Sequence, residues 1–346
     1  MIAKLFNEGD PVLRHLVATR LARTTSGYNM ARLREEMRDT KNAAYWFECL
    51  TKREGVGAIH GSRDTCFENA LGKLVSFGLG RGDAELDRAV GVFIDWIERV
   101  EEKSPFERLI APIVASVLAW GGYWQVEAIG RYWNQRINDL YEFAVNRDYS
   151  IHADKAAYKG IPQSFQDRLL IDPGLYPEGR LKLPWIYDIR AFTALRDDSA
   201  RPDMSAKIDV IIDYVLDPRY QDFPKGYGII ALEQGRYYAL GWSVWLPGFR
   251  GFEMDGFEAG CLVQRLEMMS HFPSARSSEW FINCLAHLES FKTGNGTYLF
   301  PKEYLNEKKN SYLITGGHMG LGEDRRRKAW RELESTYWML AIRRNT

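Results

Sequence analysis

Apolar residues recur at three- and four-residue intervals along most of this chain, which is the spacing of one face of an α-helix. Asp10-Pro11 supplies a capping acceptor and a preset φ before an apolar stripe at positions 12, 13, 16 and 17. Ser104-Pro105-Phe106-Glu107 has the form of a capping box with proline at the first helical position. In the part of the chain before residue 159, helices are expected over residues 40–52, after a cap at Asp64 and from Asp83. A further helix begins at Ser104 and is kinked at Pro112, and the last carries Tyr132 and ends near residue 146.

Residues 159–187 break the helical spacing, because four prolines and three glycines fall within them. They predict a long ordered loop, either a functional lid or wall or a plain linker. Helical spacing then resumes at 188–196, 203–216, 234–245, 256–271, 277–292 and 322–342. Because no segment shows the convincing alternation of apolar and polar residues that a strand would have, the predicted fold class is all-α. We expect one domain over residues 1–346, with two helical halves (about 1–158 and 188–346) joined by the loop.

A glycine turn that carries an aromatic residue or a histidine recurs three times, at 52–60, 223–228 and 292–298. Paired glycines suit tight turns, and each copy is expected to lie between helices. Helical hairpins joined in this way resemble the repeats of the terpenoid cyclase and protein prenyltransferase superfamily, in particular over residues 57–79 and 257–300. The resemblance implies an α/α toroid whose inner helices line a central cavity.

The catalytic motifs of that superfamily are not found in the sequence. No Asp-x-Asp-Asp motif occurs, and Asp197-Asp198 is followed by Ser199-Ala200-Arg201 instead of completing a metal box. No spaced set of Asp, Cys and His for zinc is visible either. No catalytic residue is therefore carried over. Toroids of this shape also occur among polysaccharide lyases and glycoside hydrolases, so the fold alone does not specify the function.

Composition narrows the class of protein further. The formal net charge is zero, which removes the electrostatic argument for a nucleic-acid or anionic-membrane binder. No run of 18 apolar residues occurs, so no membrane span is expected. Aromatic residues make up 13% of the chain, with 11 Trp and 18 Tyr. Such a surplus fits either a large core or a ligand cavity.

Cysteines and histidines are scattered. The four cysteines form no Cys-x-x-Cys pair and are predicted to be reduced and mostly buried. Acidic Glu8 comes too early for a signal peptide, so a cytoplasmic protein is expected. The six histidines are dispersed without a His-x-x-x-His pair, so neither a metal site nor a cofactor is expected.

The first candidate site combines His60, Asp64 and Glu68, which are spaced by four residues. If the helix already includes Asp64, the two carboxylates share one face. A histidine within reach of a carboxylate is a tuned acid or base. The alternative is structural, with Asp64 as the helix cap, Glu68 solvated and His60 a turn residue.

The second candidate lies between Gly316 and Arg325, where four glycines fall within seven residues. These glycines let the backbone approach another group closely, and His318 and Glu323 follow as candidate acid–base residues. Glu323 is expected at the start of a helix. The alternative is a structural crossing with solvated arginines.

The third candidate is aromatic. Tyr238, Trp242 and Trp245 would share one face of the predicted helix 234–245 and, with Tyr227, form either a ligand wall or ordinary core. Asp255 is a further candidate acid or base. Glu334 and Tyr337 on the last helix are expected to reach the same cavity.

Together these patterns favour a metal-independent acid–base enzyme, a cyclase, isomerase or lyase, acting on a small or medium organic substrate in an aromatic-lined cavity. The alternatives are a carbohydrate-active toroid and a non-enzymatic protein that binds a hydrophobic ligand in an apolar pocket. The catalytic candidates are His318, Glu323, His60 and Asp255, and the substrate-binding candidates are Tyr227, Tyr238, Trp242, Trp245, Tyr337, Asp64 and Glu68.

Overall fold

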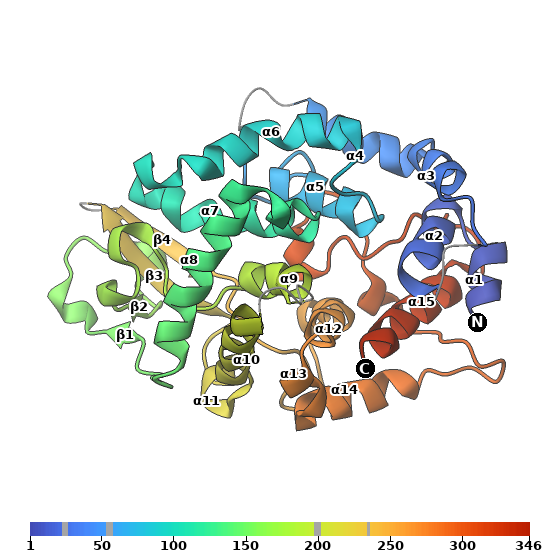
Figure 1. Cartoon of the computed structure of the whole chain (residues 1–346). Helices are drawn as coiled ribbons and strands as arrows, with labels where there is room; N and C mark the ends of the chain where they lie inside the picture. Colours follow the sequence, from blue (N-terminus) through green and yellow to red (C-terminus); the bar gives the residue numbers. More distant parts are fainter. Residues whose placement is uncertain (23–26, 53–57, 197–201, 234–235) are drawn as a thin grey trace. The chain divides into compact units, whose positions relative to one another are not determined.

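The computed structural model describes residues 1–22, 27–52, 58–196, 202–233 and 236–346. The chain is mostly helical, as predicted, with a small four-stranded sheet added (Figure 1). Its internal contacts define two compact units: unit 1 is Met1–Val90 with Pro247–Thr346, and unit 2 is Gly91–Leu246. These boundaries differ from the two halves expected on either side of residues 159–187. The single domain of two helical halves stays a prediction.

Unit 1 is built from helices contributed by both ends of the chain. Its buried side chains include the apolar stripe predicted after Asp10-Pro11. The helices are α1 (Ile2–Glu8), α2 (Pro11–Leu16), the π-helix η1 (Val17–Leu21), α3 (Met30–Arg38), α4 (Lys41–Thr51), α5 (Phe67–Ser76), the beginning of α6 (Ala84–Glu98), α12 (Gly256–Met269), α13 (Pro273–Ser277), α14 (Glu279–Glu289), the 3₁₀ turns η8 (Lys302–Leu305) and η9 (Leu313–Thr315), and α15 (Trp330–Asn345).

Unit 2 contains the remainder of α6 and the sheet. Within it α7 packs against α9, and α8 packs against α10. Its elements are η2 (Val100–Glu102), α7 (Pro105–Trp120), η3 (Tyr123–Gln125), α8 (Glu127–Ala144), β1 (His152–Ala153), η4 (Lys155–Ala157), η5 (Gln163–Phe165), β2 (Leu170–Ile171), η6 (Pro173–Leu175), η7 (Pro177–Gly179), α9 (Ile186–Leu195), α10 (Pro202–Leu216), α11 (Pro218–Gln221), β3 (Gly226–Glu233) and β4 (Arg236–Gly241).

Several predicted helix starts are confirmed. Leu86 N donates to Asp83 Oδ1 at 3.1 Å, so Asp83 caps α6. Ser104 and Glu107 form the predicted capping box at the start of α7, and Pro112 lies inside that helix. Asp64, in contrast, does not cap α5, because Cys66 is the residue that precedes it. The four cysteines are buried thiols, as expected.

The predicted helix 234–245 is wrong, because this region contributes β4 to an antiparallel pair with β3. Ile229 lies opposite Ala239 and Ile230 opposite Tyr238. β-Branched and aromatic residues favour a strand, since their side chains pack well on a pleated surface. The sheet order is β1-β2-β3-β4, with the other neighbouring pairs antiparallel (β1 with β2) and parallel (β2 with β3).

The three glycine turns have different surroundings. In the first, Gly55 and Gly57 lie outside the described residues, as do Asp197 and Asp198. The second leads into β3 and not into a helix. The third follows α14 and is closed by an antiparallel bridge between Lys292 and Tyr298. The second copy therefore does not join two helices, because strand pairing determines the conformation there.

Candidate functional site

A cavity of about 460 Å³ lies in unit 1 and is lined mainly by charged residues. Its wall draws on α4, α5, α15 and the irregular segment between η8 and α15. The volume falls within the roughly 300–1,000 Å³ of small-molecule pockets. The lining residues are Asp10, Pro11, Thr40, Lys41, Asn42, Lys73, Phe77, Glu307, Gly320, Gly322, Glu323, Asp324, Arg325 and Glu334.

Lys73 of α5 lines this cavity but is only 1% exposed. Its Nζ donates to Glu307 Oε2 at 2.8 Å, to the His318 carbonyl at 2.9 Å and to the Gly320 carbonyl at 2.6 Å. The three donors of the ammonium group thus have three acceptors. Burial lowers the pKa of Lys73, and the Glu307 carboxylate opposes that shift.

Glu307 follows η8 and faces the cavity with a side chain that is 30% exposed. Its Oε2 also accepts from Gly320 N at 2.7 Å. Burial by itself raises the pKa of Glu307, but the charge of Lys73 and the contact with His318 bring it down to about 2. Glu307 is therefore a carboxylate throughout the neutral pH range.

Glu334 of α15 has no exposed surface. Its Oε1 accepts from Leu321 N at 2.8 Å, and its Oε2 accepts from Arg325 Nη2 at 2.9 Å. Burial nevertheless raises the pKa of Glu334 to about 7, with Arg325 and the Leu321 N–H opposing. The group is thus poised to exchange a proton near neutral pH.

Glu323 is the second such group on the cavity wall, and its side chain is fully buried. It accepts from the backbone N–H of Asp10 and lies 3.2 Å from Arg327 Nη1. Burial raises the pKa of Glu323 to about 7, and the Asp10 N–H opposes the shift. Glu323 does not begin a helix as predicted, because Gly322 has a φ of +83° and α15 starts only at Trp330.

The glycines of this segment allow the close approach that the sequence predicts. A Cβ at Gly320 would lie 2.6 Å from Glu307 Oε2 and 3.0 Å from Arg325 Nη2. A Cβ at Gly322 would lie 2.7 Å from Val12 Cγ2. The Glu307 carboxylate can reach Lys73 past this backbone only because residue 320 has no side chain.

His318 is placed next to the cavity wall with its imidazole 1% exposed. Its Nε2 donates to the Ser311 carbonyl at 2.8 Å. Its Nδ1 is buried, has no hydrogen-bond partner and lies 3.8 Å from Glu307 Oε1. His318 therefore backs Glu307 instead of lining the cavity itself.

His60, Asp64 and Glu68 belong to unit 1 as well, but they do not line this cavity. His60 Nδ1 lies 2.6 Å from Glu68 Oε1, so the predicted contact of a histidine with a carboxylate exists. The solvated alternative for Glu68 is wrong, because its side chain is 0% exposed. Asp64 precedes α5 and accepts from Tyr45 Oη and Asn310 N, both at 2.7 Å.

The remaining candidates have structural surroundings. Asp255 caps α12 by accepting from Phe257 N at 2.9 Å and Glu258 N at 2.8 Å. Tyr337 is buried in α15 and is not among the residues that line the cavity. Neither residue is brought to Glu323.

The aromatic candidates all lie in unit 2, and they do not share a helical face. Tyr227 in β3 is buried and hydrogen-bonds to Tyr220 Oη and the Pro184 carbonyl. Tyr238 in β4 stacks on Phe106 with ring centroids 4.8 Å apart. Trp242 follows β4 with a φ of +61°, and Trp245 is buried beside Lys225.

The residues that sequence reasoning missed are Lys73, Glu307 and Arg325. Lys73 carries the clearest signal, because it is the one charged residue in the apolar run 70–75. Lysines are almost never fully buried unless paired, so a lysine in this apolar run indicates a carboxylate partner elsewhere in the chain. Glu307 has no comparable signal, because 234 residues separate it from Lys73.

In the described part of the chain, no group of three or more His, Cys, Asp or Glu side chains is arranged to hold a metal ion. No helix within the described residues is long and apolar enough to cross a bilayer. No known protein family, curated protein or solved structure matches the chain.

Proposed function

We propose that this protein is an acid–base enzyme of the lyase or isomerase class, and that the unit 1 cavity is its active site. The observation that carries the proposal is the split between carboxyl groups on one cavity wall. The pKa of Glu307 is about 2, whereas the pKa values of Glu323 and Glu334 are about 7. Such a split assigns a base that is always ionised and acids that retain protons near neutrality.

The roles follow from protonation and charge. Glu307 accepts a proton from a substrate oxygen or from a carbon acidified by a neighbouring carbonyl group, because its carboxylate faces the cavity but is a weak base. Glu323 or Glu334 returns a proton, since each is about half protonated at pH 7. Arg325 lines the same cavity and supplies positive charge for an oxygen that becomes negative during the reaction. His318 and Lys73 hold Glu307 in position.

Glycoside hydrolysis is the second candidate function, because it uses the same division between an ionised carboxylate and a protonated carboxylic acid. The apolar-ligand hypothesis predicts a pocket without convergent ionisable groups. The unit 1 cavity does not fit that expectation, since most of its lining residues are charged or polar.

The test is a reaction screen in D₂O with 2-oxo acids, 3-hydroxy acids, aldoses and 4-nitrophenyl glycosides, followed by ¹H NMR. We expect deuterium incorporation, isomerisation or elimination with at least one carbon acid. Glu307→Gln should reduce that rate by roughly 10²- to 10⁴-fold, because proton transfer contributes about that much. The rate should also fall as pH rises through 7, when Glu323 and Glu334 lose their protons.

Glu332→Gln is the matched control. Glu332 also lies in α15 but pairs with Lys4 at 2.6 Å and is not among the cavity-lining residues. Its substitution should leave the rate unchanged. Cleavage of glycosides without exchange at carbon would favour the hydrolase. The absence of any reaction across the panel would contradict the enzyme proposal.

The α/α toroid, its relation to the terpenoid cyclase superfamily and the cytoplasmic location stay predictions from the sequence. Fractionation of the source cells would test the location.

A further inference from the structure

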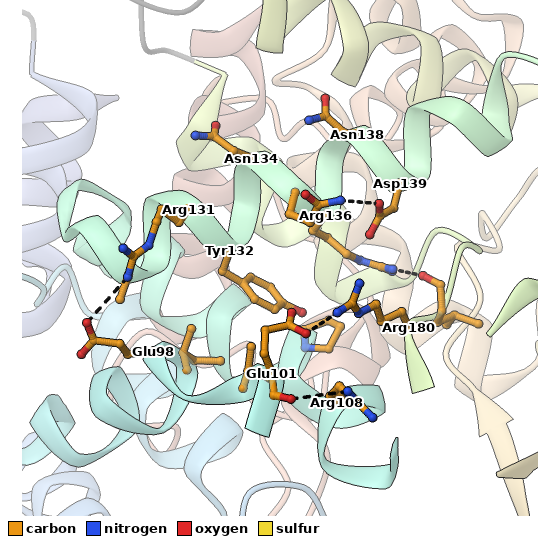
Figure 2. A pocket seen from close by; sticks show the side chains of 16 residues that line it. Glu98, Glu101, Arg108, Arg131, Tyr132, Asn134, Arg136, Asn138, Asp139 and Arg180 are labelled. Carbon is orange, nitrogen blue, oxygen red and sulfur yellow. Dashed lines mark hydrogen bonds and ion pairs between the residues drawn. The ribbon is translucent and has the colours of Figure 1, made fainter. Parts of the chain in front are cut away.

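Unit 2 contains a second cavity of about 460 Å³, which the proposed function does not use. Figure 2 shows its side chains, which come from α6, η2, α7, α8 and the segment that follows η7. Part of the lining is apolar, and the ring of Tyr132 lies near the centre of this view. The apolar lining residues are Ile97, Val100, Pro112, Ala128 and Leu181.

Four arginines line this cavity, and three of them have a carboxylate oxygen within 3.1 Å. Arg136 is the most firmly held, because it donates to both oxygens of Asp188 at 3.0 and 2.7 Å and to two backbone carbonyls. The pairs are Arg136 with Asp188, Arg180 with Glu101, and Arg131 with Glu98 and Glu127.

Arg108 is the exception. Its side chain is 15% exposed, and its Nε is buried without a hydrogen-bond partner. Its Nη1 reaches the Glu101 carbonyl at 3.5 Å and Glu178 Oε2 at 3.6 Å, both long contacts. A guanidinium whose Nη1 is held only by such long contacts is weakly paired, so an anionic group supplied by a ligand in the cavity would complete its pairing.

We propose that this cavity binds a small organic monocarboxylate, with the carboxylate on Arg108 and the apolar body against Tyr132 and Ala128. The guanidinium fork matches the two oxygens of a carboxylate. Glu98, Glu101 and Asp139 also line the cavity, and their charges disfavour a dianion such as a phosphate monoester. The site lies within unit 2 and is independent of the active site proposed in unit 1.

The test is a ligand-observed NMR titration of the full chain with three probes that share the naphthyl ring and differ in the polar group: 1-naphthoate, neutral 1-naphthamide and 1-naphthyl phosphate. We expect 1-naphthoate to bind at least about tenfold more tightly than either of the others, a ratio that one charge-assisted contact can provide. Arg108→Gln should remove this preference, and Arg108→Lys should retain part of it, because lysine keeps the charge but loses the fork.

Arg99→Gln is the matched control, since Arg99 is exposed and adjoins η2 but is not among the lining residues. It should leave 1-naphthoate binding unchanged. Ala128→Trp should fill the cavity and abolish binding of 1-naphthoate and 1-naphthamide alike. Equal affinity of the wild type for acid and amide, tighter binding of the phosphate, no binding of 1-naphthoate, or an unchanged preference in Arg108→Gln would each overturn the proposal.

Discussion

Gly320 is a residue at which the unit 1 site is sensitive to an added methyl group. Gly320→Ala would place a Cβ 2.6 Å from Glu307 Oε2, inside van der Waals contact. We expect a loss of about 1–3 kcal/mol in the free energy of unfolding, because the carboxylate must move away from Lys73. Urea denaturation would measure it. The control is Gly294→Ala, where nothing lies within 4 Å of the added Cβ and the effect should be near zero.

The raised pKa of Glu334 leads to a prediction about how the free energy of unfolding depends on pH. The folded-state pKa of about 7 exceeds the ordinary value of 4.5, so between these values the folded protein binds more protons at this site than the unfolded chain does. The contribution of Glu334 to stability is therefore present below about pH 4.5 and is lost as pH rises toward 7. The slope is about 1.4 kcal/mol per pH unit.

Glu334→Gln isolates this effect, because glutamine cannot ionise. Relative to the wild type, the variant should gain stability as pH rises from 5 to 7, by the slope given above. Urea denaturation at a series of pH values would measure the difference. Glu48→Gln is the control, since that side chain is 54% exposed in α4. A difference between wild type and Glu334→Gln that does not vary with pH would show that Glu334 is ionised throughout.

Single residues were predicted best where the chemistry is local. Asp83 and Ser104 cap helices through neighbours three residues away, so their roles can be read from a short segment. Glu323 was found because glycines mark its surroundings. Asp64 was misassigned as a helix cap, because its carboxylate accepts from Asn310 N, 246 residues away.

Among elements, α5 is attached to the segment between η8 and α15 through Lys73 and through Asn69, whose Oδ1 accepts from Leu313 N. Lys73→Met would leave the Glu307 carboxylate and two carbonyls without their buried donor. We expect unit 1 to lose about 3–5 kcal/mol, the usual effect of removing one partner of a buried ion pair. Thermal or urea unfolding would measure it.

The double variant Lys73→Met with Glu307→Gln tests whether the loss comes from the unpaired carboxylate. It should recover part of the stability, because a neutral amide is less costly to bury than an unpaired charge. If the two substitutions were simply additive, the ion pair would not be the cause of the destabilisation.

The helices were predictable as elements because the apolar spacing, caps and prolines that define each helix all lie within its own segment of the chain. The strands were not. β1 and β2 have two residues each, too few for any periodicity, and β4 is defined by its pairing with β3. The start of α15 was placed eight residues too early, at Gly322, whose left-handed φ is incompatible with a helical position.

At the scale of the whole molecule, the chain crosses between its two units twice. Unit 1 joins the first 90 residues to the last 100, whereas unit 2 is continuous. A proline-rich segment such as 159–187 suggests a boundary when only the sequence is read, but it lies within unit 2. Contacts between segments that are distant in the chain define the two units, and these contacts cannot be inferred from composition.

The sequence by itself determined that the chain is mostly helical, where most helices begin and end, that its cysteines are buried thiols, and that the segment from Gly316 to Gly322 approaches another group closely. These features depend on interactions among residues close in the chain or on side-chain size and polarity. Only the tertiary structure decided that Lys73, Glu307 and Glu334 share one cavity wall and that Arg108 faces another. Both arrangements depend on which distant segments meet. Burial and charge at these places shift the pKa values of Glu307 and Glu334 and leave Arg108 Nε without an acceptor.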